Sequence, residues 1–240
     1  DSFRIQGFYN CDCGFVATAL YCQNAHKTTL YTRNASKSTM AYLEQQFGLP
    51  EMQGLSAKQI EVHLKLYAGY VKNTNLIVDK IGELSSDIEK NTYLIGELQR
   101  RFGFEWNGMR NHEYYFKSLE GGAKNLPTDS KLKTAIEKQA PSFDLWLSGF
   151  KNLAMTRGIG WAILYYDKQT DQLMHTWVDE QHLGHLNSCA PILMLDMWEH
   201  SFVADYQPSG KKNYVEDFFQ KREYIKIKPL LYIFKKCWYR

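Results

Sequence analysis

The sequence predicts an α+β fold in which an N-terminal helical hairpin precedes an α/β part with a small antiparallel sheet of about three strands. Two observations lead to this prediction. Apolar residues recur at helical spacing through residues 55–122, whereas between residues 160 and 196 they gather in short strand-like runs. Helices that come first along the chain and strands that come later are typical of this fold class.

The composition is that of an ordinary globular protein and argues against several kinds of partner. Of the 240 residues, 44% are apolar and 23% are charged, so a sizeable core is expected. The net charge of +3 is too small to indicate binding of nucleic acid. The sequence contains no apolar run of about 18 residues, so no membrane partner is expected either.

The cysteines favour a reducing compartment. None of the five belongs to a C-x-x-C pair, and an odd number argues against a disulfide framework. The chain is therefore expected to be intracellular, and cytoplasmic in the simplest case.

Both ends of the chain differ from its middle. From Cys13 to Leu43 there is no Asp or Glu, so residues 1–39 are either a transit-like segment or an unstructured extension ahead of Met40. A transit segment would direct the chain to a mitochondrion or a plastid. Residues 226–240 form a basic and aromatic tail, expected to be a docking segment or disordered.

The first predicted helix covers residues 55–73. Ser56 followed by Gln59 is the pattern of a capping box, which satisfies the free backbone N–H groups at a helix start. Three side chains of the amphipathic run that follows share one face: His63, Tyr67 and Tyr70.

The helical pattern continues over residues 76–102, as expected of a hairpin partner, and again over residues 104–122. His112 lies on the apolar stripe of the latter run. Gly121–Gly122 is a plausible stop, because glycine readily adopts the left-handed conformation that ends many helices. A helical hairpin domain is therefore expected over residues 40–125.

A second, α/β domain is expected over residues 126–225. It begins with a shorter helix near residues 130–154, and helical pattern returns from about residue 211 to residue 224. Between them lie three strand-like runs, residues 160–167, 173–180 and 191–196, of which the first two are joined by the turn-prone K-Q-T-D.

Asp196 and His200 directly follow the third predicted strand. A carboxylate at the edge of a buried strand needs compensation for its charge, and a metal ion would supply it. His63 and His112, each on a helix face, complete a set of three imidazoles and one carboxylate, which suits manganese, iron or zinc. Spacing alone is weak support, because a lone histidine on a helix face is more often a hydrogen-bonded core residue.

A second group of histidines lies in H-T-W-V-D-E-Q-H-L-G-H-L: His175, His182 and His185. They could form another metal site, since two of them are three residues apart. We interpret the segment instead as strand and loop with ordinary polar histidines.

Four short motifs occur in one order: I-E-V-H-L-K-L-Y-A-G-Y-V-K-N, N-H-E-Y-Y-F, G-I-G-W-A-I-L and L-D-M-W-E-H-S-F-V-A-D-Y. In this order they resemble the iron/manganese superoxide dismutase family, whose D-x-W-E-H pattern is present at residues 196–200. The resemblance extends from about Leu55 to Phe219. It implies the two-part fold and a metal-dependent oxidoreductase that disproportionates superoxide to dioxygen and hydrogen peroxide.

The resemblance also implies roles for single residues. One manganese or iron ion per chain would be bound by His63, His112, Asp196 and His200, with a solvent molecule as fifth ligand. Tyr70 matches a tyrosine beside the substrate funnel, and Trp161 and Trp198 match aromatic residues that wall the site. Glu199 matches a glutamate that reaches across a two-fold interface, so a homodimer or a tetramer is implied.

The family supplies a glutamine beside that solvent from one of two positions. Iron-type members usually carry it four residues before the second histidine ligand, where this chain has Gly108. Manganese-type members carry glycine there and take the glutamine from the strand region. Gln181, counted back from Asp196 without a gap, falls at that second position, although a shift of one residue would put His182 there. Manganese is therefore favoured over iron.

The chain departs from the family pattern in several places. The segment between His63 and Tyr70 is one residue shorter than usual and lacks a histidine, for which Tyr67 is the candidate replacement. Other positions differ as well: Val203 replaces a tyrosine, and Phe116 and Tyr224 stand where tryptophan is common.

Two alternative functions are weighed against the dismutase. A catalytically silent structural subunit of the same fold would tend to lose ligands, and this chain has all four. A mononuclear iron oxygenase uses two histidines and one carboxylate, and the third histidine argues against it.

Overall fold

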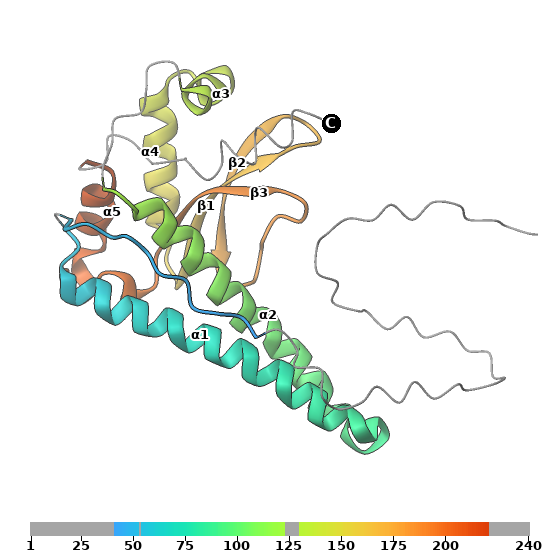
Figure 1. The fold of residues 1–240 in the computed structure, drawn as a ribbon. Coiled ribbons are helices and arrows are strands. Elements are labelled where there is room, and N and C mark those ends of the chain that lie inside the picture. The colour runs from blue at the N-terminus through green and yellow to red at the C-terminus, as the bar shows by residue number, and fades with distance from the viewer. Residues whose placement is uncertain (1–40, 53, 123–129, 221–240) are drawn as a thin grey trace, which may run out of the picture. The chain divides into compact units, whose positions relative to one another are not determined.

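The structure is a computed structural model that describes residues 41–52, 54–122 and 130–220 (Figure 1). The predictions for residues 1–39, for Tyr224 and for the tail 226–240 lie outside the described residues. The helices and strands in chain order are α1 (Ala57–Leu84), α2 (Ile88–Leu119), α3 (Lys131–Gln139), α4 (Phe143–Ala154), β1 (Gly160–Asp167), β2 (Gln172–Asp179), β3 (Ala190–Asp196) and α5 (Lys211–Gln220).

The predicted α+β class is confirmed: α1 and α2 form a long hairpin, and the sheet with its helices follows (Figure 1). The hairpin turns at the short 3-10 segment Ser85–Asp87, inside the range 76–102 that the sequence predicts as one helical pattern. The hydroxyls of Ser85 and Ser86 donate to the carbonyls of Ile81 and Glu83. These local bonds compete with helix continuation and allow the chain to turn.

Serine caps begin three of the helices. The hydroxyls of Ser56, Ser130 and Ser142 accept a backbone N–H bond three residues further on. The predicted capping box is only half correct, because the Gln59 side chain does not return to the N–H of Ser56. That N–H instead donates to Oδ2 of Asp205, at 2.6 Å.

The single helix predicted near residues 130–154 is two helices, α3 and α4. Ala140 has an extended backbone, with φ −125° and ψ 151°, directly before Pro141. Proline has no N–H and disfavours helical geometry in the residue before it, so the helix ends there.

The sheet is antiparallel with strand order β2-β1-β3, so β1 is central. Seven of the eight positions of β1 are buried, which explains its nearly continuous apolar sequence. The register pairs Trp161 with Val178 on one side and with Asp196 on the other. This pairing aligns the start of β1 with the end of β3.

One hydrophobic core joins the hairpin to the sheet. It contains Tyr115 and Phe116 of α2 together with Ile163 and Leu195 of the sheet, all at most 1% exposed. Helix α4 packs on β1 and β2 (Figure 1). None of the helices in the described ranges combines the length and apolar composition needed to cross a membrane.

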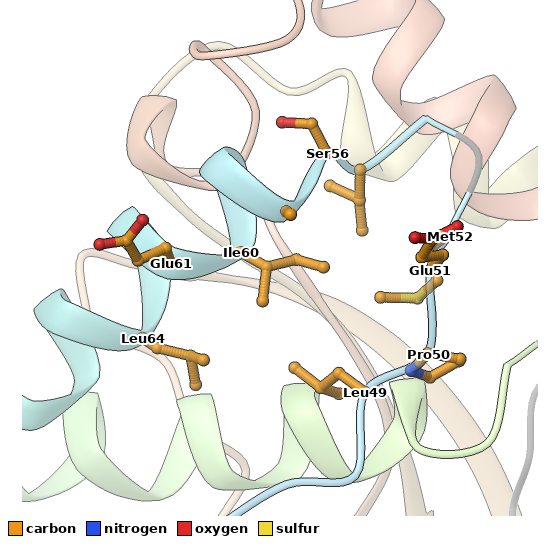
Figure 2. Close-up of a pocket in the computed structure, with 10 residues that line it drawn as sticks. Leu49, Pro50, Glu51, Met52, Ser56, Ile60, Glu61 and Leu64 are labelled. Carbon is orange, nitrogen blue, oxygen red and sulfur yellow. The ribbon is translucent and has the colours of Figure 1, made fainter.

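A groove of about 500 Å³ lies between residues 49–52, together with Leu55, and the first turns of α1. Figure 2 shows Leu49, Ile60 and Leu64 among the side chains that line it. No side chain of the histidine and aspartate cluster lines this groove.

Candidate metal centre

Four predicted ligands meet between the hairpin and the sheet. The potential ligand atoms of His63, His112, Asp196 and His200 all lie within 4.8 Å of one another. The Nε2 atoms of the three histidines are 3.0, 3.5 and 3.3 Å from Oδ2 of Asp196, in that order. The fold therefore brings together residues that are up to 137 positions apart in the sequence.

Each of the four side chains is positioned by a different helix, strand or turn. His63 projects from α1, and His112 from α2. The Nδ1–H of His112 donates to the carbonyl oxygen of Gly108 at 2.6 Å, so its Nε2 is left to face the cluster. Asp196 ends β3, and its Oδ1 accepts the backbone N–H of Trp198 at 2.9 Å. His200 follows in the 3-10 turn Glu199–Ser201.

The unpaired atoms of the cluster fit a metal ion. Among the described residues, Nε2 of His112 and Nε2 of His200 are buried and have no hydrogen-bond partner. A buried polar atom without a partner is costly, and a cation between these nitrogens and the Asp196 carboxylate would satisfy all of them. Three imidazoles and one carboxylate are suitable donors for manganese or iron.

The electrostatics of the cluster keep its groups in the forms that bind metal. Burial lowers the pKa of His63, and burial together with the neighbouring His63 lowers the pKa of His112 to about 3, so both imidazoles are neutral near pH 7. Burial raises the pKa of Asp196, but His200 and His63 outweigh it and hold that pKa well below its usual range. Neutral imidazole and ionised carboxylate are the forms that coordinate a metal.

Gln181 lies beside the cluster and links two other predicted site residues. It is fully buried. Its Nε2 donates to the hydroxyl of Tyr70 at 3.0 Å, and its Oε1 accepts from the indole N–H of Trp161 at 2.9 Å. The structure thus brings Gln181, and not the neighbouring His182, into this position. Directly before Gln181, the chain turns after β2 at Glu180, which has a φ of 50°.

Aromatic rings enclose the cluster. Trp161 packs edge-on against His112 at 5.1 Å between ring centroids, and Trp198 stacks on His200 at 5.5 Å. The ring of Tyr70 lies 5.1 Å from that of His112. Burial, followed by the charges of Asp196 and Glu105, raises the pKa of Tyr70, so its hydroxyl stays protonated.

Known proteins resemble this chain over most of its length. Residues 127–228 match the family model described as iron/manganese superoxide dismutases, C-terminal domain. A protein named superoxide dismutase [Fe] from Cupriavidus metallidurans is 34% identical over 173 residues, which cover 71% of this chain and 85% of that protein. The chain belongs to the iron/manganese superoxide dismutase family.

Further relatives in this family carry either metal in their names. One from Aquifex pyrophilus, named superoxide dismutase [Fe], is 30% identical over 70% of this chain and 80% of the relative. One from Mycolicibacterium fortuitum, named superoxide dismutase [Mn], is 32% identical over 65% of this chain and 74% of the relative. The family membership therefore does not distinguish iron from manganese.

Gly108, where iron-type members of the family usually carry glutamine, cannot accept a side chain here without a rearrangement. A Cβ at this position would lie 2.5 Å from Cδ1 of Tyr70. The ring of Tyr70 therefore occupies the space into which a side chain at residue 108 would extend, and Gln181 reaches Tyr70 from the opposite part of the fold.

The other predicted positions are found as follows. His182 packs its ring against Phe104, with 5.6 Å between centroids. His185 contacts the hydroxyl of Tyr165 and the carbonyl of Gln181, at 2.6 and 3.1 Å. The cluster of four described above is the one potential metal site found in the described ranges, so no second histidine site forms there.

The structure shows the surroundings of three residues at which the chain departs from the family pattern. Tyr67, the candidate replacement for the missing histidine, donates to Glu113 at 3.2 Å and accepts from the N–H of Gln45 at 2.9 Å, so its hydrogen bonds do not go to Tyr70. Phe116 packs on His63, with 4.9 Å between ring centroids. Val203 is 42% exposed in the single chain.

The sequence predicts Gln59 as the second member of a capping box, but its side chain bonds elsewhere. Its side chain spans from α1 to the loop that carries the last ligand, donating to the carbonyl of His200 at 2.6 Å and accepting from the N–H of Ala204 at 2.9 Å. Its position, one turn before His63 on the same helix face, was a usable indication that it faces the site.

Asn111 is a second supporting residue that the sequence did not single out. Its side chain donates to the carbonyl of Gln181 at 3.0 Å and is 3% exposed. It follows from this contact that α2 positions both a ligand, His112, and the backbone of the glutamine.

Proposed function

We propose that this protein is a superoxide dismutase, which converts two superoxide anions and two protons into dioxygen and hydrogen peroxide. The observation that carries the proposal is the buried cluster of three histidine nitrogens around the Asp196 carboxylate, two of those nitrogens having no hydrogen-bond partner. Its metal-dependent oxidoreductase activity also follows from the relatives, which are named superoxide dismutases.

Four residues of the chain would bind the metal ion. His63, His112, Asp196 and His200 would hold one metal ion, and that ion, when bound, supplies the one-electron oxidation and reduction. Asp196 brings one negative charge into the buried cluster, so it lowers the net charge that a di- or trivalent ion would otherwise place there.

Gln181 and Tyr70 would supply oriented hydrogen bonds and a proton-bearing hydroxyl beside the cluster. The amide of Gln181 is fixed between the Tyr70 hydroxyl and the Trp161 indole, so it has a defined orientation beside the cluster. Tyr70 keeps its proton and is part-buried, which suits a hydrogen-bond donor at the boundary between the cluster and solvent. Trp161 and Trp198 exclude water and so limit side reactions.

We favour manganese over iron as the resident metal. Gly108 matches manganese-type members, and the crowding of its position by Tyr70 supports a glutamine supplied by residue 181. Relatives of both metal types are similar to the chain, so this preference rests on those two residues.

The deciding experiment measures superoxide decay per bound metal on purified protein whose manganese and iron have been quantified. Fast decay in proportion to manganese is the expected result. Decay in proportion to iron would retain the function and refute the metal assignment. Full metal occupancy without fast decay would refute the function in favour of a silent structural subunit, and consumption of an organic substrate instead would favour an oxygenase.

We further propose that the chain acts as a homodimer or tetramer through Glu199. The residue is exposed in the single chain although it directly precedes His200, which suits a carboxylate that pairs across an interface. Glu199→Ala is expected to retain one metal per chain and to raise the concentration at which the assembly dissociates by more than about tenfold. Sedimentation equilibrium measures this, with Glu89→Ala as a matched control on the hairpin. A monomeric wild-type protein would refute the proposal.

A further inference from the structure

Phe104 connects the surface of α2 to the surroundings of the cluster. Its ring packs on Tyr70, with 6.0 Å between centroids, and on Trp198, with 6.4 Å. Tyr70 in turn contacts His112, and Trp198 stacks on His200. Phe104 is therefore separated from the cluster by a single layer of side chains.

Arg101, one turn before Phe104 on α2, covers that ring. Its guanidinium carbon lies 3.9 Å from the ring centroid, which is a cation–π contact. The Arg101 side chain is 51% exposed, so its charge also faces solvent, and Nη2 lies 2.7 Å from Oε1 of Glu105. Arg101 thus lies over Phe104, one ring away from Tyr70.

Glu105 is a nearly buried carboxylate, with a side chain only 5% exposed. Its Oε2 accepts a long hydrogen bond, 3.4 Å, from the side chain of Asn73, three residues after Tyr70 on α1. After burial and the Asp196 charge, Glu105 is a further cause that raises the pKa of Tyr70, whereas Arg101 opposes it. Both charges are therefore within electrostatic range of the Tyr70 hydroxyl.

An unpaired carboxylate at this place would hinder an anionic substrate. Water screens a nearly buried charge poorly, so Glu105 alone would repel an anion that approaches Tyr70. A cation 2.7 Å from the carboxylate cancels most of that field at longer range. Local charge of this kind changes association rates of charged ligands by about 10-fold to 1,000-fold.

We propose that Arg101 is the counter-charge that admits the anionic substrate: paired with Glu105 above Phe104, it keeps the approach to Tyr70 from being negative. This inference rests on the proposed dismutase function. Arg101 acts on the approach of the substrate through Glu105 and does not touch the reacting atoms.

The experiment compares four metal-loaded forms of the full chain: wild type, Arg101→Gln, Glu105→Gln and the double variant. Superoxide decay per bound metal is measured from about 0.01 M to about 1 M ionic strength, a range over which the screening length falls about tenfold. Arg101→Gln is expected to be about 10-fold slower than wild type at low ionic strength, with the difference shrinking as salt is added. The double variant is expected to stay within about twofold of wild type, because no unpaired charge remains. Glu105→Gln is expected to be faster than both at low ionic strength, because its unpaired Arg101 attracts the anion.

Arg100→Gln is the matched control. Arg100 is the neighbouring residue, is 72% exposed and pairs with Glu97, so its replacement removes the same charge from the same helix without exposing Glu105. Its decay rate is expected to stay within about twofold of wild type. An equal loss in Arg100→Gln and Arg101→Gln would overturn the proposal, because net charge alone would then explain both.

Azide binding provides a readout that needs no turnover. The affinity of the metal-loaded protein for this small anion, followed by visible absorption, is expected to weaken in Arg101→Gln and to recover in the double variant. A double variant as impaired as Arg101→Gln in both decay and azide affinity would overturn the proposal and assign the loss to packing over Phe104. Absence of superoxide decay in the wild type would refute the proposed function, while the azide titrations would still decide the role of Arg101.

Thermal unfolding and metal content establish that each variant is folded and loaded. If Arg101→Gln fails to fold, the pair Glu105→Gln and Arg101→Gln/Glu105→Gln decides, since both lack the carboxylate. A Glu105→Gln variant that is faster than the double variant at low ionic strength, with a difference that shrinks as salt is added, supports the proposal. Equal rates contradict it, because the Arg101 charge would then have no effect on the approach of the anion.

Discussion

His112 faces the cluster with Nε2 because its Nδ1–H donates to the carbonyl oxygen of Gly108. With the imidazole oriented in this way, its removal leaves an open position in the cluster. His112→Ala is therefore expected to lower metal content well below one ion per chain, with a loss of affinity of more than about tenfold.

Metal analysis after equilibration with a manganese buffer measures the effect of His112→Ala. His175→Ala is the control, because His175 is an exposed residue of β2 outside the cluster and its variant is expected to keep one metal per chain. Full metal retention in His112→Ala would remove this residue from the site.

Gln181 holds both of its side-chain polar atoms in buried hydrogen bonds, to Tyr70 and Trp161. Gln181→Ala is expected to slow superoxide turnover by about 10-fold to 100-fold while largely retaining metal, because the residue orients hydrogen bonds beside the cluster and is not a ligand. Turnover per bound metal measures this, with His182→Ala expected to remain close to wild type. Unchanged turnover in Gln181→Ala together with a loss in His182→Ala would transfer the role to His182.

At the scale of secondary structure, α1 and α2 approach closely where Gly108 meets the ring of Tyr70. Gly108→Ala is expected to lower the free energy of unfolding by about 1–3 kcal/mol, because the new Cβ forces the Tyr70 ring to move. Urea denaturation measures the change.

Gly96→Ala is the matched control for Gly108→Ala. Gly96 also lies in α2, but a Cβ there meets nothing within 4 Å, so the variant is expected to be more stable by about 0.5–1 kcal/mol. In a Tyr70→Ala background the cost of Gly108→Ala is expected to disappear largely. An equal cost in both backgrounds would mean that the Tyr70 contact is not its cause.

The helices and strands were largely predictable from local patterns, and the ends of the strands were too, whereas the ends of the helices were not. The strand ranges 160–167, 173–180 and 191–196 differ from β1, β2 and β3 by at most one residue at either end, because β1 and β3 are continuous apolar runs and turn residues bound β2. The hairpin turn at Ser85–Asp87 was missed, because its serines are compatible with a helix and only their bonds to preceding carbonyls end it. The break at Pro141 is one that the sequence could have predicted, because proline disfavours helical geometry in the residue before it.

For the whole molecule, the buried neutral histidines make stability depend on pH in the absence of metal. Burial lowers the pKa of His112 from 6.5 to about 3 in the folded chain, so the unfolded chain takes up a proton first as the pH falls. The contribution of neutral His112 to the free energy of unfolding is therefore fully present above the pKa of the unfolded chain, near 6.5, and is lost as the pH falls toward 3.

Urea denaturation of the metal-free chain between pH 7 and pH 4 is expected to show the free energy of unfolding falling by about 1.4 kcal/mol per pH unit for one such histidine. His112→Gln, which cannot take up this proton, is expected to have a shallower pH dependence. The same slope in both proteins would mean that His112 does not carry the effect.

The sequence by itself determined the fold class, the approximate strand ranges and the four candidate ligands, because these follow from periodicity and from short motifs of neighbouring residues. Only the tertiary structure decided that Gln181, and not His182, bonds to Tyr70, since these partners are 111 positions apart. It also revealed that Gln59 joins α1 to the loop of His200, 141 positions away. Contacts over such separations depend on how the hairpin packs against the sheet, and no local pattern encodes that packing.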